Sequence, residues 1–120
     1  MKKLTLALAG SAIFALASGA SAADLAAGKA AFEKFTCATC HGADAKTSTL
    51  PSYPILAGQH QDYLEHALRS YQRGAAGAPN TANVRKNAVM GAMVAQLSPA
   101  DIKNISAWLA SLPSPLAVRK

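Results

Sequence analysis

The sequence predicts an all-α fold in which three to five helices form one small domain. Apolar residues recur three and four positions apart in several segments, which is the spacing of one face of a helix. Typical capping residues stand before the first and the last of these segments. Almost no segment alternates polar and apolar residues, as a half-buried strand does. Proline, glycine, serine and threonine gather between the helical segments, which indicates loops.

The first helix is expected from Leu25 to about Phe35. Asp24 is a candidate N-cap, because its carboxylate can accept a hydrogen bond from a free amide of the first turn. The side of this helix that faces the core carries apolar or small residues at helical spacings, namely Leu25, Gly28, Phe32 and Phe35.

A loop from Gly42 to Gly58 and a second helix from His60 to Arg73 are expected next. The loop contains two prolines and several serine and threonine residues. The helix has an apolar stripe formed by Tyr63, Leu64, Ala67, Leu68 and Tyr71. Gly74 is expected to end this helix, because glycine often follows a last helical turn.

Two further helices are expected in the C-terminal part of the chain. A linker from Ala75 to Asn80 leads to a third, looser helix from Asn83 to Leu97. The last helix begins after Ser98 as N-cap, with Pro99 at the first helical position and Asp101 reaching back to the cap. Its apolar stripe is Ile102, Ile105, Leu109 and Leu112, and Pro113 and Pro115 end it.

Directly after the first helix lies Cys37-Ala38-Thr39-Cys40-His41, which has the form C-x-x-C-H. This is the attachment motif of a covalently bound c-type haem. Each thiol adds across one vinyl group of the porphyrin, and the adjacent imidazole coordinates the iron from one face. The chain has two cysteines, both in this motif, so no other thiol competes. The sequence therefore predicts one haem c attached through Cys37 and Cys40, with His41 as an iron ligand.

Two other chemistries use similar residues. A bare C-x-x-C pair can be a thiol–disulfide centre, but that centre favours a βαβ context and gives His41 no role. Zinc is the sharper alternative, because His60 and His66 follow with a spacing that Cys2His2 sites use. The gap between Cys40 and His60 is longer than the usual linker of about 12 residues. A helix would also place His60 and His66 off a common face. Haem is therefore the preferred interpretation.

The N-terminus has the form of a secretory signal peptide. Two lysines precede an apolar run from Leu4 to Ala17, and Ala20-Ser21-Ala22 fits the rule for cleavage after Ala22. The run is too short for a membrane anchor, which needs roughly 20 apolar residues, and no other segment is apolar enough to span. We therefore expect a signal peptide over residues 1–22 and one soluble domain over residues 23–120, exported to the bacterial periplasm.

The composition carries two further expectations. The chain has three Phe, three Tyr and one Trp, so a domain of this size has limited material for a core. An enclosed haem would supply part of that core. The formal net charge is +6, but the basic residues are scattered, so the surface is not expected to bind nucleic acid.

A haem iron that only transfers electrons usually has a second axial ligand. The candidates in the mature chain are Met90, Met93, His60 and His66. A methionine sulfur would give His/Met coordination, which raises the reduction potential. Both histidines lie among polar neighbours. One of the two methionines is therefore the expected ligand, and the other is expected to fill core space.

These features together resemble the class I c-type cytochromes, specifically the small bacterial periplasmic proteins with one haem. They are also similar to one half of the dihaem periplasmic cytochromes. The resemblance covers essentially all of the mature chain. It rests, in order, on Gly28 and Phe32, Cys37-x-x-Cys40-His41-Gly42, Tyr53 to Gln59, Tyr63-Leu64, Arg69 to Gly74, Met90-x-x-Met93, and Leu97-Ser98 to Asp101-Ile102 with Trp108.

The resemblance implies a cytochrome c fold wrapped around one haem. Cys37 and Cys40 would carry the thioethers, His41 would be the proximal ligand, and Met90 would be the distal ligand. Pro54 matches the proline whose carbonyl accepts a hydrogen bond from the proximal imidazole, which fixes the orientation of the ring.

The resemblance also implies that the first and last helices cross. Gly28 would allow their close approach, with Phe32 and Trp108 at the contact.

The implied function is electron transfer, without substrate turnover. The protein would accept one electron from a reductase or dehydrogenase and pass it to an oxidase or another carrier, the iron alternating between Fe(III) and Fe(II). One alternative is a haem sensor with an open distal position, against which a filled sixth position argues. Another is a small electron-entry subunit of a larger periplasmic redox enzyme, which the sequence does not separate from a free carrier.

Overall fold

The computed structural model describes residues 22–116, which fold into α-helices and one 3-10 helix without strands. The predicted all-α class is confirmed. The predicted signal peptide lies outside the described residues, except for Ala22 at its end, and so do residues 117–120 of the predicted mature domain. In chain order the elements are α1 (Leu25–Lys34), α2 (Ala38–His41), α3 (Gln61–Ala75), η1 (Asn80–Ala82), α4 (Ala88–Val94) and α5 (Pro99–Ser111).

Helix α1 begins and ends where the sequence predicts. The Asp24 carboxylate accepts a hydrogen bond from the Ala27 amide at 3.0 Å, as an N-cap does. The Asp24 amide in turn donates to Oδ1 of Asn104 at 3.0 Å, so the cap also joins α1 to α5. Phe35 is the C-cap.

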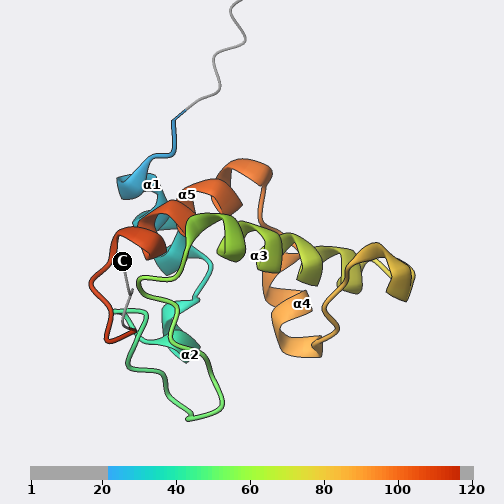
Figure 1. Cartoon of the computed structure of the whole chain (residues 1–120), viewed down its shortest axis with the longest axis horizontal. Helices are drawn as coiled ribbons and strands as arrows, with labels where there is room; N and C mark the ends of the chain where they lie inside the picture. The colour runs from blue at the N-terminus through green and yellow to red at the C-terminus, as the bar shows by residue number, and fades with distance from the viewer. Residues whose placement is uncertain (1–21, 117–120) are drawn as a thin grey trace, which may run out of the picture.

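Helices α1 and α5 pack directly against each other, as Figure 1 shows for the blue and red helices. A Cβ atom at Gly28 would lie 2.1 Å from the Asn104 carbonyl oxygen, so only glycine allows this approach. The rings of Phe32 and Trp108 meet with centroids 5.0 Å apart and a tilt of 52°. Both side chains are buried, at 1% and 9% exposure. The structure thus has the expected crossing of the first and last helices.

The start of α5 also matches the prediction. The Ser98 hydroxyl accepts from the Asp101 amide at 3.1 Å, and the Asp101 carboxylate accepts from the Ser98 amide at 2.9 Å. This reciprocal capping box satisfies two amides that a helix start otherwise leaves unpaired. Pro99 is the first helical residue, and Leu112 is the C-cap before Pro113.

Helix α3 does not end at Gly74, as the sequence suggested, but continues to Ala75. The glycine that ends it is Gly77, which has a φ of +77°. The Gly77 amide donates to the Gly74 carbonyl at 3.2 Å, and the Ala78 amide donates to the Arg73 carbonyl at 3.0 Å. These two bonds form a Schellman motif. Gly74 serves close packing instead, because a Cβ there would lie 2.1 Å from the Arg85 carbonyl oxygen.

The expected third helix from Asn83 to Leu97 is wrong in its first part, because α4 covers only Ala88–Val94. Residues 83–87, called the strap below, are not helical. The strap is bound to α3: the Arg85 amide donates to the Ser70 carbonyl at 3.0 Å, and the Arg73 guanidinium donates to the Asn83 carbonyl at 2.8 Å. These contacts with α3 use the backbone groups that a helix would have paired internally.

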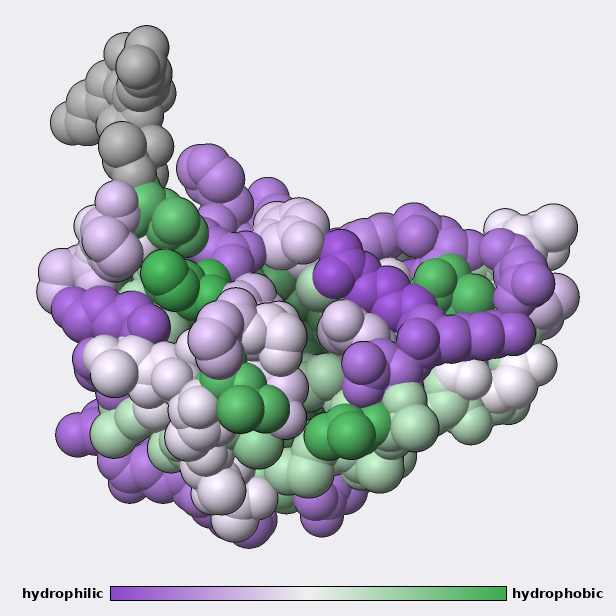
Figure 2. Space-filling model, turned by 90° about the horizontal axis from the view of Figure 1, so that it is seen from below, coloured by the Kyte–Doolittle hydropathy of each residue, from purple (hydrophilic) through white to green (hydrophobic). Residues whose placement is uncertain are grey.

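Helix α3 lies between the other elements (Figure 1). It contacts α5 towards one end and α4 towards the other. Within residues 22–116, no helix is both long and apolar enough to cross a membrane. On the face shown in Figure 2, the most hydrophobic residues appear as separate spots between polar side chains.

Candidate haem site

A cavity of about 340 Å³ lies between α2, α3, α4 and α5. This size is within the range of small-molecule and cofactor sites. The cavity wall is mainly aliphatic and aromatic. The structure brings all five predicted site residues to this wall, namely Cys37, Cys40, His41, Pro54 and Met90.

The short helix α2 presents the two thiols and the imidazole together. Cys37, its N-cap, is followed three and four residues later by Cys40 and His41, which places all three on one side of a helical turn. Thr36, with a φ of +57°, turns the chain between α1 and α2. Both cysteines are free thiols and half-buried. Burial raises the pKa of the Cys37 thiol, and a nearby backbone hydrogen bond opposes this effect.

The His41 imidazole is buried, with 6% of its surface exposed. Its Nδ1 lies 3.3 Å from the Pro54 carbonyl oxygen, which can only accept, so Nδ1 carries the proton. Nε2 is then the nitrogen with a free lone pair, as metal coordination requires. Burial lowers the pKa of His41, although the bond to Pro54 acts in the opposite direction. The neutral imidazole is thus the favoured form at neutral pH.

The loop between α2 and α3 holds Pro54 against His41. Ala45 is fully buried, and its carbonyl accepts from the amides of Leu56 at 2.9 Å and Ala57 at 3.0 Å. Before it, the Asp44 carboxylate accepts from the Thr47 amide at 2.8 Å and the Thr47 hydroxyl at 2.7 Å. Sequence reasoning assigned no role to residues 43–52. The Asp44-x-x-Thr47 pattern of a side-chain turn was the signal available there.

Helix α4 carries the two candidate methionines, and both Met90 and Met93 line the cavity. The Asn87 side chain accepts from the Met90 amide at 2.9 Å, which makes Asn87 the N-cap of α4 and fixes the first turn. Met90 also packs against the hydrophobic core.

The other ligand candidates lie elsewhere. His60 is an exposed residue at the start of α3, and neither it nor His66 lines the cavity. His66 instead contacts the strap, where its Nε2 lies 2.7 Å from Nδ2 of Asn83. Within residues 22–116, no three side chains of His, Cys, Asp or Glu form a group that could hold a metal ion. The four residues considered for zinc are therefore not brought together.

Sequence reasoning left Arg85 of the strap out of the site, but the structure places it on the cavity wall. Its Nη2 donates to the Tyr63 hydroxyl at 3.0 Å. Its guanidinium lies over the rings of Tyr63 and Tyr71, at 5.4 Å and 5.6 Å from their centroids. Hydrogen bonds to Tyr63 and Tyr71 raise the pKa of the guanidinium. The position of Arg85 depends on the path of the strap, which local sequence patterns did not predict.

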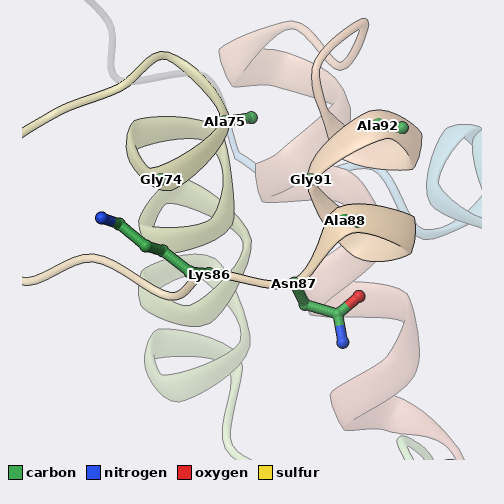
Figure 3. A pocket seen from close by; sticks show the side chains of 7 residues that line it. All are labelled: Gly74, Ala75, Lys86, Asn87, Ala88, Gly91 and Ala92. Carbon is green, nitrogen blue, oxygen red and sulfur yellow. The ribbon is translucent and has the colours of Figure 1, made fainter.

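A second hollow lies between α3 and α4 and is lined mainly by small residues (Figure 3). It contains none of the predicted site residues. Gly91 faces Ala75 there, and a Cβ at Gly91 would lie 3.3 Å from the Ala75 Cβ. These small side chains let α4 pack close to α3.

The residues of the main cavity fit a haem. Two free thiols, an imidazole with its lone pair available, and methionine sulfur on a separate helix meet at one largely apolar wall. A helical fold with this set of donors defines a c-type haem protein. The comparisons with known proteins agree. The chain belongs to the cytochrome c family, whose model, described as Cytochrome c, matches residues 25–113.

Several relatives show how far the similarity extends. The "Thiosulfate dehydrogenase electron acceptor" of Stutzerimonas stutzeri (strain A1501) is 34% identical over 119 residues, covering 96% of this chain and 51% of that relative. "Cytochrome c-554(548)" of Halomonas halodenitrificans is 37% identical over 76 residues, covering 63% of this chain and 83% of that relative. A crystal structure of reduced recombinant cytochrome c4 from Pseudomonas stutzeri superposes with a TM-score of 0.66 at 35% identity, covering 77% of this chain and 47% of that one.

The chain thus spans about half the length of two of these proteins, 51% and 47%. Cytochromes c bind haem covalently and carry electrons. The predicted cytochrome c fold and the haem c cofactor are therefore confirmed, and these relatives support the predicted electron-transfer function.

Proposed function

We propose that this protein is a periplasmic one-haem electron carrier in which His41 and Met90 are the two axial ligands. The observation that carries the proposal is the meeting of the C-x-x-C-H turn, the Pro54 carbonyl and α4 at one cavity. The N-terminal signal-like segment supports export, and residues 1–22 would be removed from a mature domain over residues 23–120.

The chain's own residues divide the work of such a carrier. When bound, the haem takes up and releases one electron. Cys37 and Cys40 would anchor it through thioether bonds, so that it would stay with the protein in both oxidation states. The Pro54 carbonyl holds the His41 ring in one orientation and keeps Nδ1 protonated. Met90 on α4 would supply the second ligand of the haem iron and so would leave no open position for a substrate.

The partners we propose are redox proteins. The donor would be a reductase or dehydrogenase, in line with the relative named as the electron acceptor of thiosulfate dehydrogenase. The acceptor would be an oxidase or another carrier. A role as a small electron-entry subunit of a larger redox enzyme is the second candidate. The protein would catalyse no reaction of its own in either role.

Acid–acetone extraction of the purified mature protein, followed by mass spectrometry and optical spectra, tests this proposal. Haem should stay with the polypeptide, the mass should equal a chain from Ala23 plus one haem, and the spectrum should change reversibly on reduction. Cys37→Ala should give a poorly maturing product with one thioether bond. Extractable haem would contradict covalent attachment. Ready binding of carbon monoxide to the reduced unmodified protein would contradict the carrier and favour a sensor.

A further inference from the structure

The bond between His41 and the Pro54 carbonyl depends on how that carbonyl is directed. At 3.3 Å the bond is already long, so a small rotation of the carbonyl would break it. Pro54 is exposed, and its ring fixes its own φ at about −65°. The remaining freedom of the carbonyl lies in how the next peptide group, between Ile55 and Leu56, is held.

The peptide group between Ile55 and Leu56 is bound at both ends. Its N–H, the Leu56 amide, donates to the carbonyl of the buried Ala45 at 2.9 Å. Its C=O, the Ile55 carbonyl, accepts a hydrogen bond from Nε2 of Gln59. Because N–H and C=O point in opposite directions from a trans peptide, these two bonds fix the plane of the group. Gln59 supplies one of the two.

Gln59 is itself ordered by its neighbours. Its backbone amide donates to the Leu56 carbonyl at 3.3 Å, and the Gly58 amide donates to the Leu109 carbonyl of α5 at 2.9 Å. Gly58 has a φ of +77°, and a Cβ there would lie 2.3 Å from the Ser114 Cβ, so this turn requires glycine. The Gln59 side chain is half-buried and lines the cavity. A donor on so constrained a turn can hold a peptide group in one orientation.

We propose that Gln59 is a positioning residue, which acts through Ile55 to direct the Pro54 carbonyl at Nδ1 of His41 and so lowers the reduction potential of the iron. This inference rests on the proposed function, because it requires His41 as an iron ligand. A hydrogen bond from Nδ1 makes the imidazole a more basic ligand. A more basic ligand stabilises the ferric ion more than the ferrous ion, because the ferric ion carries the higher charge.

The test compares the holoprotein with Gln59→Leu and with the control Gln61→Leu. Both changes replace a half-buried amide by an apolar side chain. The Gln61 amide donates to Oε1 of Glu65 at 2.9 Å, and Gln61 does not line the cavity. In Gln59→Leu the equilibrium constant for one-electron reduction should rise up to about tenfold, equivalent to about 59 mV. Gln61→Leu should leave it unchanged.

NMR of His41 in the reduced holoprotein gives a second measurement. Weakening of its bond to Pro54 should move the nitrogen shift of Nδ1 and speed the exchange of the Nδ1 proton in Gln59→Leu, but not in Gln61→Leu. A cavity that merely loosened would admit water, which favours the more highly charged ferric state and lowers the potential. An unchanged or lower potential in Gln59→Leu would therefore overturn the inference, and so would an unchanged Nδ1 shift.

Gln59→Glu provides the second variant if Gln59→Leu does not mature. Glutamate matches glutamine in size, but its ionised carboxylate only accepts hydrogen bonds and cannot bind the Ile55 carbonyl. The Nδ1 shift of His41 should move at neutral pH, and an unchanged shift would overturn the inference. Retained haem with a reversible spectrum in these variants shows that the proposed function stands whichever way the Gln59 result falls.

Discussion

At the residue scale, the site depends on how each donor is placed as well as on which donors are present. His41 is buried and makes a directed bond to a backbone carbonyl, which defines its protonated nitrogen. The two methionines are less fixed, because Met90 and Met93 both line the cavity and lie three residues apart on α4. Experiment is therefore needed most to decide which of the two methionines is the distal ligand.

Replacing Met90 with Ala should remove the sulfur–iron charge-transfer band of the ferric protein. It should also lower the reduction potential and let carbon monoxide bind the reduced iron, because the distal position would be open. Optical spectra and a potentiometric titration measure these changes. Met93→Ala is the matched control, and it should keep the band and lose about 2 kcal/mol of stability, the low end for truncating a methionine that is only half-buried. The reverse pattern would assign the ligand to Met93.

Asp44 should titrate well below other carboxylates. Hydrogen bonds from the Lys46 and Thr47 amides and from the Thr47 hydroxyl lower its pKa to about 2. Because the folded pKa lies below the usual value of 3.8, Asp44 stabilises the loop above that pH. The stabilisation should be lost as the pH falls from 3.8 towards 2. An NMR titration of the carboxyl group checks this.

In Asp44→Ala this step in acid stability should disappear, and the Thr47 amide should exchange faster at neutral pH. A carboxyl group that titrates near 3.8 in the folded protein would refute the turn geometry.

At the scale of elements, local capping chemistry predicted helix ends, and contacts between distant segments changed them. The first residues of α1 and α5 could be predicted from Asp24, Ser98 and Asp101, whose side chains accept hydrogen bonds from amides or donate to each other in the first turn. The end of α3 was misjudged because Gly77, and not Gly74, ends the helix. The start of α4 was misjudged because hydrogen bonds join the strap to α3 across the fold. No pattern within either segment records those bonds.

Gly74→Ala tests the role of the strap in placing α4. The new Cβ would lie 2.1 Å from the Arg85 carbonyl oxygen, a backbone atom that moves only with the strap. Overpacking of this kind costs about 1–3 kcal/mol, which should exceed the gain in helix propensity of about 1 kcal/mol. Thermal unfolding of the holoprotein should show the loss, and the sulfur–iron band should weaken because α4 follows the strap.

Gly91→Ala is the control for Gly74→Ala, since both glycines lie in the hollow of Figure 3. The nearest atom to its new Cβ would be the Ala75 Cβ, at 3.3 Å, and a small shift relieves that contact. Gly91→Ala should therefore change the thermal stability and the sulfur–iron band very little. Equal effects of the two substitutions would show that the strap does not position α4.

At the scale of the whole molecule, the core is built around the cavity. Several of the most buried apolar side chains also line the cavity wall, namely Phe32, Leu64, Val94, Leu97, Ile105 and Leu109. The sequence predicted a core completed by haem because aromatic residues are few. It also located the attachment motif, since Cys37, Cys40 and His41 are contiguous. Arg85 could not be assigned in this way, because its place on the wall comes from tertiary contacts of the strap.

The protein without haem should therefore be largely unfolded. Removing haem would expose the apolar faces that line the cavity to water, and a domain of this size has little stability in reserve. Chain produced without haem attachment, for example as Cys37→Ala with Cys40→Ala, should show much lower helix content by circular dichroism than the holoprotein. It should also be digested rapidly by protease. Phe32→Ala in the holoprotein provides a smaller change for comparison. Losing this buried ring should lower the free energy of unfolding by about 3–5 kcal/mol while the haem stays attached. Full helix content in the haem-free chain would show that α1, α3 and α5 form a sufficient core by themselves.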